Sequence, residues 1–197
     1  MQRAAIGFRV HSGWAALVVL TLERAEPLIL IRRKLQLVKT FTYTFRQPYH
    51  TAEKMELAEA SAFVRMVEKE SFELALAGIL EVRKELEHLR YSLRSAALLA
   101  ASGRKLPEFQ KILSSHALIH TADGELFRAS IRRACTRAKV PLNQIPEREL
   151  MSIASQRLKK RPEFLNRQVA ALGKSLGPPW TQDEKLSTLA AWLTLVS

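Results

Sequence analysis

The chain has 197 residues and a formal net charge of +12 at pH 7, from 31 Lys and Arg against 19 Asp and Glu. With 47% hydrophobic residues it can bury a sizeable core, which excludes a disordered chain. No charge-free run of eighteen apolar residues and no three-part signal peptide is present, so we expect a cytoplasmic protein without membrane contact. The excess of positive charge favours a polyanionic partner, nucleic acid first.

Residues 4–20 predict a β-hairpin. Apolar residues fill both arms, and the polar turn carries Gly13, which can adopt the positive φ of a tight hairpin turn. Strands that are apolar at every position are usually covered on both faces, so this hairpin should lie at the centre of the fold.

The next segments predict one more strand and a helical insertion. Pro27 marks the entry to a strand over 27–38, and the alternation over 40–45 predicts its extension or an edge strand. Residues 51–93 change to a helical spacing of apolar positions. Because one helix of this length would be too long for a compact domain, we expect a break near Ser71 and helices over 52–69 and 71–92.

The second half predicts two further strands separated by helices. An apolar run over 94–101, closed by Ser102 and Gly103, is expected to be the fourth strand, and residues 140–145 a short fifth. A loop is expected at 116–120. Helices are predicted over 108–114, 122–138, 147–158 and 162–176, and a last one begins at the capping box Thr181 to Glu184.

This order of elements resembles the ribonuclease-H-like fold, and two short motifs resemble RuvC-type Holliday-junction resolvases. The first strand of that family reads apolar, Gly, apolar, Asp, and Gly-Trp opens its second strand; here Ile6 to Arg9 and Gly13-Trp14 occupy these places. Asp183 precedes the run Leu189 to Trp192, as an aspartate precedes the alanine-rich last helix of those nucleases. The resemblance implies an α/β fold in one domain over 1–197: a mixed sheet of about five strands, helices on both faces and a helical arm, the insertion at about 51–93.

The chain departs from this resemblance where the chemistry would lie. Two-metal phosphodiester cleavage requires several carboxylates around cations held about 4 Å apart. Arg9 stands where the family has its first-strand aspartate, and residues 95–101 contain no carboxylate. Asp183 and Glu184 remain, and both have a plainer role at a helix N-terminus. Since a guanidinium repels cations and attracts phosphate, the pattern favours an anion pocket at Arg9.

Basic residues form two further groups that are candidates for anion binding beside Arg9 and His11. One group falls on the helix predicted over 122–138, and the other is a dense run just before residue 162. The candidates are Arg128, Arg132, Arg133, Lys159, Lys160 and Arg161. For either group alone, the plainer interpretation is a solvated basic face.

A group of histidines and carboxylates lies at residues 116–125. His116, His120, Asp123 and Glu125 include the ligand types of a transition metal, although their spacing is not specific. Thr121 followed by Asp123 and Glu125 is more simply a capped, acidic first helical turn, so no metal site is predicted. Cys135 has no partner at metal-ligand spacing and is expected in the core. The common nucleotide-binding and hydrolase motifs are absent from the sequence, and no cofactor is expected.

Three functional hypotheses follow. The first is a non-catalytic ribonuclease-H-like protein that binds nucleic acid or another polyanion through Arg9 and the basic helices. The second is a divergent metal-dependent nuclease that uses Mg²⁺ or Mn²⁺ and the carboxylates Asp183, Glu184 and Glu125. The third is an interaction protein whose 51–93 helices pair with a partner or with a second copy of the chain to form a homo-oligomer.

Overall fold

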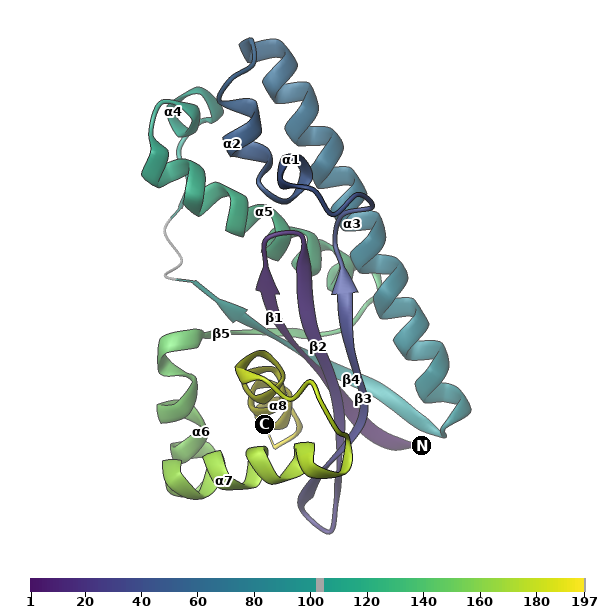
Figure 1. Ribbon diagram of the computed structural model, residues 1–197. Helices are drawn as coiled ribbons and strands as arrows, with labels where there is room; N and C mark the ends of the chain where they lie inside the picture. The colour runs from purple at the N-terminus through teal and green to yellow at the C-terminus, as the bar shows by residue number, and fades with distance from the viewer. Residues whose placement is uncertain (102–104, 197) are drawn as a thin grey trace.

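The computed structural model describes residues 1–101 and 105–196 (Figure 1). One sheet contains five strands in the order β3-β2-β1-β4-β5. Their bounds are β1 (Gln2–His11), β2 (Trp14–Glu23), β3 (Glu26–Gln36), β4 (Tyr91–Ala100) and β5 (Leu142–Pro146). The predicted hairpin, third, fourth and fifth strands are confirmed, and Gly13 takes the expected positive φ of 82° at the hairpin turn. The turn expected at Ser102 and Gly103 lies outside the described residues.

The sheet is mixed. β1 pairs antiparallel with β2, and β2 pairs antiparallel with β3. On its other side β1 pairs parallel with β4, which pairs parallel with β5. The carboxyl ends of β1, β4 and β5 therefore lie at the same edge of the sheet, which is where open α/β sheets place their ligands.

Helices cover both faces, as the resemblance predicted (Figure 1). One layer holds α3 (Leu57–His88) and α5 (His116–Arg137), together with the short helices α1 (Tyr43–Arg46), α2 (Pro48–Ala52) and α4 (Phe109–Leu113). The other layer holds α6 (Leu150–Leu158), α7 (Pro162–Leu172) and α8 (Gln182–Leu195). The 3₁₀ turns η1 (Glu147–Glu149) and η2 (Gly173–Ser175) flank α6 and α7. Within the described residues, no helix combines the length and apolar character needed to cross a bilayer.

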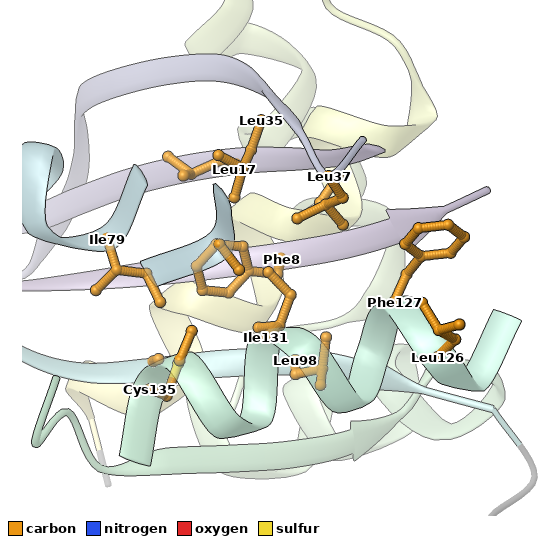
Figure 2. Packing of buried hydrophobic residues seen from close by; sticks show 14 of the residues in the cluster. Phe8, Leu17, Leu35, Leu37, Ile79, Leu98, Leu126, Phe127, Ile131 and Cys135 are labelled. Carbon is orange, nitrogen blue, oxygen red and sulfur yellow. The ribbon is translucent and has the colours of Figure 1, made fainter. Parts of the chain in front are cut away.

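The two faces of β1 belong to two different cores. Ile6 and Phe8 point into the layer of α3 and α5, where Figure 2 shows Phe8 beside Leu98 and Ile131. Cys135 is buried in the same core, as expected, and burial raises the pKa of its thiol to about 12. Ala5 points into the other core, beneath α8. This alternation assigns Gly7 and Arg9 to the α8 face of the strand.

The prediction that residues 40–45 extend the third strand or form an edge strand is wrong. The chain leaves the sheet after β3, buries Leu37 and Val38, and then turns into α1. The alternating aromatics do not share one buried face: Phe41 and Tyr43 are exposed, whereas Phe45 packs against the core beside Phe63. The guanidinium of Arg46 lies 4.5 Å from the ring centroid of Phe41.

The helix break predicted near Ser71 is also wrong, because α3 is continuous from Leu57 to His88. Ser71 is buried in the middle of the helix and lies in phase with Val64, Val67 and Ala75 on the core-facing stripe. A helix of 32 residues spans about 48 Å. It runs beside the sheet and continues past the sheet edge toward α2, so the compact core does not limit its length (Figure 1).

The loop predicted over 116–120 is helical, since α5 begins at His116. Ile119 and Ala122 are buried on its inner face, which continues the apolar stripe of the predicted helix by one further turn. Thr121 consequently lies inside α5, where its hydroxyl donates to the carbonyl of Ala117 at 2.9 Å. The interpretation of Thr121 as a helix cap is therefore wrong.

Candidate functional site

The candidate site lies at the edge where β1 and β5 end. Arg9 is near the end of β1, and Glu147 directly follows the last residue of β5. Asp183 is in the first turn of α8, whose N-terminus is held by the predicted capping box: Asp183 N–H donates to Thr181, and Thr181 N–H donates to Glu184. Three distant parts of the sequence therefore meet at one point.

Close packing of α8 on β1 brings Asp183 to this edge. A Cβ atom built on Gly7 would lie 1.9 Å from the carbonyl oxygen of Ser187, so only glycine allows the helix backbone to approach the strand this closely. Ser187 donates to the carbonyl of Ala16 at 3.3 Å, which fixes the same helix to β2. The glycine that resembles the first-strand motif of RuvC-type nucleases thus has a packing role.

The guanidinium of Arg9 lies between two carboxylates. Its Nε and Nη2 donate to the two oxygens of Glu147 at 3.0 and 2.6 Å, a bidentate pair. Its Nη1 donates to Oδ1 of Asp183, and Nε2 of His11 lies 2.9 Å from the same oxygen. The side chains of Arg9 and Asp183 are only 23% and 19% exposed, so water screens this network only in part.

The network shifts the ionisation of both partners toward their charged forms. The hydrogen bond to Glu147 raises the pKa of Arg9 against the opposing effect of its burial, and Asp183 raises it further. Burial alone would raise the pKa of Asp183, but hydrogen bonds from Arg9 and His11 outweigh it and hold that pKa below its ordinary value. At neutral pH the site therefore holds a fixed protein cation between two carboxylates.

The carboxylates expected for a nuclease all have other partners. Asp183 pairs with Arg9, Glu184 completes the capping box of α8, and Glu125 pairs with Arg132 and with Arg128, the latter at 3.7 Å. Glu147 was not predicted. The signal that identifies it is its place directly after a parallel strand, at the edge shared with the end of β1.

Arg9 faces acids rather than a group of basic residues. Arg9 and His11, the two candidates on this strand, lie together at the site, and both ends of the guanidinium are already bound to protein oxygens. An anion pocket centred on Arg9 would need to compete with two carboxylates, so this residue is better described as a neutralising cation.

The basic residues of α5 are largely engaged within the protein. The side chains of Arg128 and Arg132 are 20% and 30% exposed and pair with Glu125. The guanidinium of Arg133 lies 4.8 Å from the ring centroid of Phe72. Arg128 and Arg132 are therefore engaged within the protein, whereas Arg133 is exposed and contacts the Phe72 ring.

The second basic group forms a corner between α6 and α7, in the opposite layer from α5. An open pocket of about 600 Å³ is lined by the cations Lys160, Arg161 and Arg167, by one carboxylate, Glu163, and by the exposed ring of Phe164. The ammonium of Lys160 lies 4.9 Å from this ring. Lys159, at the left-handed C-cap of α6, is exposed beside them. We call Lys159, Lys160, Arg161, Phe164 and Arg167 the basic corner.

The predicted group at 116–125 is divided by the structure. His116 and His120 share one face of α5, with their Nε2 atoms 3.1 Å apart. Asp123 is buried and accepts hydrogen bonds from His50 and from the Tyr49 backbone, whereas Glu125 faces the arginines of α5. His50, on α2, was not predicted because 66 residues separate it from His116 in the sequence.

Comparison of the sequence with protein families and with curated proteins gives no match. Among solved structures, RuvC of Thermus thermophilus in complex with a Holliday junction substrate is similar, with a TM-score of 0.55, 11% identity and coverage of 98% of this chain and 93% of RuvC. A second Thermus thermophilus RuvC structure gives a TM-score of 0.53 and 12% identity over the same shares. The yeast mitochondrial Holliday junction resolvase Ydc2 has a TM-score of 0.47 and 10% sequence identity, with coverage of 98% of this chain and 76% of Ydc2. The two RuvC structures show that the chain has the ribonuclease-H-like, RuvC-like fold that its motifs resemble.

Proposed function

We propose that this protein binds nucleic acid on a RuvC-like scaffold without cleaving it. The observation that carries the proposal is the position of Arg9 between Glu147 and Asp183. Metal-dependent cleavage requires carboxylate oxygens free to hold cations, which activate water and neutralise the leaving oxygen. Here a covalently attached cation takes those oxygens and repels a divalent ion.

Nucleic acid is the polyanion that fits best. The net charge of +12 attracts a phosphate backbone, and Arg9 removes much of the repulsion that two carboxylates would exert on it. The RuvC structure that shares this fold was solved with a Holliday junction substrate, which makes branched DNA the first ligand to test.

The basic corner is the proposed contact surface. Lys159, Arg161 and Arg167 are exposed, and Phe164 offers a ring surface among them. Cations that follow a phosphate backbone beside an exposed aromatic ring are the usual combination for binding single strands and splayed ends. The arginines of α5 are less suited, because Glu125 and Phe72 already engage them.

Binding is tested by fluorescence anisotropy with a labelled four-way DNA junction, a linear duplex and a single strand, over a range of salt concentrations. We expect affinity to fall steeply with salt. In a plot of the logarithm of the binding constant against the logarithm of salt concentration, each duplex phosphate that the protein neutralises should contribute about −0.9 to the slope. The triple substitution Lys159→Ala, Arg161→Ala, Arg167→Ala should weaken binding and flatten the slope. The matched control removes three exposed charges from α3, by Arg65→Ala, Lys69→Ala and Lys84→Ala.

Two results would overturn the proposal. Affinity that is independent of salt, or that both triple variants reduce equally, would reject the basic corner as a nucleic-acid contact. Cleavage of any of these substrates with Mg²⁺ or Mn²⁺, lost in Asp183→Ala, would instead establish a metal-dependent nuclease. We expect all substrates to remain intact.

A further inference from the structure

Three histidines from two helices converge outside the Arg9 site. His50 is on α2, and His116 and His120 are one turn apart on α5. One ring nitrogen of each lies within 4.8 Å of the others. The rings of His50 and His120 are 4.4 Å apart between centroids, and all three pairs meet edge to face.

The nitrogen positions approach those of a metal site. Zinc binds imidazole nitrogen at about 2.0 to 2.1 Å in tetrahedral geometry, which places two ligand nitrogens about 3.3 Å apart. The Nε2 atoms of His116 and His120 are already 3.1 Å apart. Both of these side chains are exposed, and their ligand nitrogens lie within 4.8 Å of that of His50, so their rings have room to turn toward a shared ion.

A buried carboxylate orients the third histidine. Nδ1 of His50 lies 2.5 Å from Oδ2 of Asp123, and the side chains are only 8% and 4% exposed. The Tyr49 backbone N–H donates to the other oxygen of Asp123 at 2.7 Å, which fixes the carboxylate in turn. In a neutral imidazole, a hydrogen bond from Nδ1–H to a carboxylate places the lone pair on Nε2, and such a carboxylate is the usual support of a metal-binding histidine.

We propose that His50, His116 and His120 bind one Zn²⁺ ion, with Asp123 as the residue that positions His50. Three imidazole nitrogens suit zinc better than Mg²⁺, which prefers oxygen ligands. His116 and His120 face solvent, so a water molecule completes the tetrahedron. The ion ties α2 to α5, and this role is independent of the nucleic-acid proposal.

The test is zinc binding by the untagged full chain, freed of metal with a chelator. Competition with a fluorescent zinc chelator should give one Zn²⁺ per chain, and Co²⁺ should give the visible absorption bands of a tetrahedral site. His120→Ala should abolish one-to-one binding and the cobalt bands. His88→Ala, which removes an exposed histidine from α3, should change neither.

Asp123→Asn tests the positioning role, and we expect about a 10- to 100-fold loss of zinc affinity with the one-to-one stoichiometry retained. Zinc should also raise the Tm of the native protein and of His88→Ala, but not that of His120→Ala. The proposal is overturned if the native chain takes up no zinc at micromolar concentrations, or if His120→Ala and His88→Ala bind it equally. Because His120 is exposed, His120→Ala should fold, and circular dichroism checks this.

Discussion

Arg9 performs at the scale of a single residue what bound cations do in a two-metal centre: it neutralises converging carboxylates. Its charge cannot dissociate, and its geometry is fixed by the bidentate pair with Glu147. A divalent ion activates a bound water molecule by lowering its pKa, whereas a guanidinium, which has no coordination site, does not. Arg9 therefore balances the charge of the two carboxylates, which is the basis of the proposal that the site does not cleave nucleic acid.

This network should contribute stability that depends on pH in a defined direction. The pKa of Asp183 is lower in the folded protein than its ordinary value, so its contribution is complete above about pH 4 and is lost as the pH falls through the lower folded value. Asp183→Asn should reduce the free energy of unfolding by about 1 to 2 kcal/mol at pH 7, and by progressively less below pH 4. Urea unfolding between pH 7 and pH 3 measures the difference.

Glu87→Gln is the control for this experiment, because it removes an exposed carboxylate from α3. It should change the free energy of unfolding by less than about 0.5 kcal/mol throughout this range. A cost of Asp183→Asn that stays constant down to pH 3 would show that the carboxylate is not held ionised by Arg9.

At the scale of elements, the contact between β1 and α8 sets the site. Gly7→Ala should destabilise the protein by about 3 kcal/mol or more, because the added methyl group would overlap the carbonyl of Ser187 and push α8 off the strand. Gly124→Ala is the matched comparison. Its Cβ would meet only the movable end of the Arg128 side chain, so it should stabilise α5 by about 0.5 to 1 kcal/mol. Chemical denaturation measures both variants.

If the two alanine variants changed stability in the same direction, close packing of α8 would not explain the glycine. Loss of stability in Gly7→Ala alone would also predict weaker pairing of Asp183 with Arg9, since the helix carries this carboxylate. The double variant Gly7→Ala, Asp183→Asn should therefore lose less unfolding free energy than the sum of the losses in the two single variants.

The elements that the sequence predicts well are those whose pattern reflects burial. Residues 4–8 of β1 and most of β2 are apolar because both faces are covered there, and the capping box of α8 depends only on four adjacent residues. The prediction over residues 40–45 failed for the opposite reason, because the contacts of Phe41 with Lys34 and Arg46 are not contained in local periodicity. At residues 116–120 a helical signal is present, since Ile119 continues the apolar stripe of α5, but it extends over only one turn.

At the scale of the whole molecule, the fold brings together what the chain separates. Arg9 could be identified from its place in the first strand, but Glu147 lies 138 residues away and joins it only because β1, β4 and β5 share an edge. His50 meets α5 for a similar reason, through the packing of α2. Contacts of this kind depend on the order of the strands in the sheet and on how the helices pack. A single sequence indicates that arrangement only where it resembles a known fold.

The two basic groups that look equivalent in the sequence occupy opposite layers of the sheet, and they should behave differently. Replacing Arg128, Arg132 and Arg133 with alanine removes three positive charges, as the basic corner variant does, so both carry the same net charge. Because Glu125 and Phe72 engage these arginines, their loss leaves a carboxylate without its partners and uncovers apolar surface.

The α5 variant should therefore lose several degrees of Tm and little affinity for DNA, whereas the corner variant should lose affinity and keep its Tm. Thermal unfolding and anisotropy on the same preparations decide this, and equal losses of affinity would mean that net charge, rather than the basic corner, determines binding.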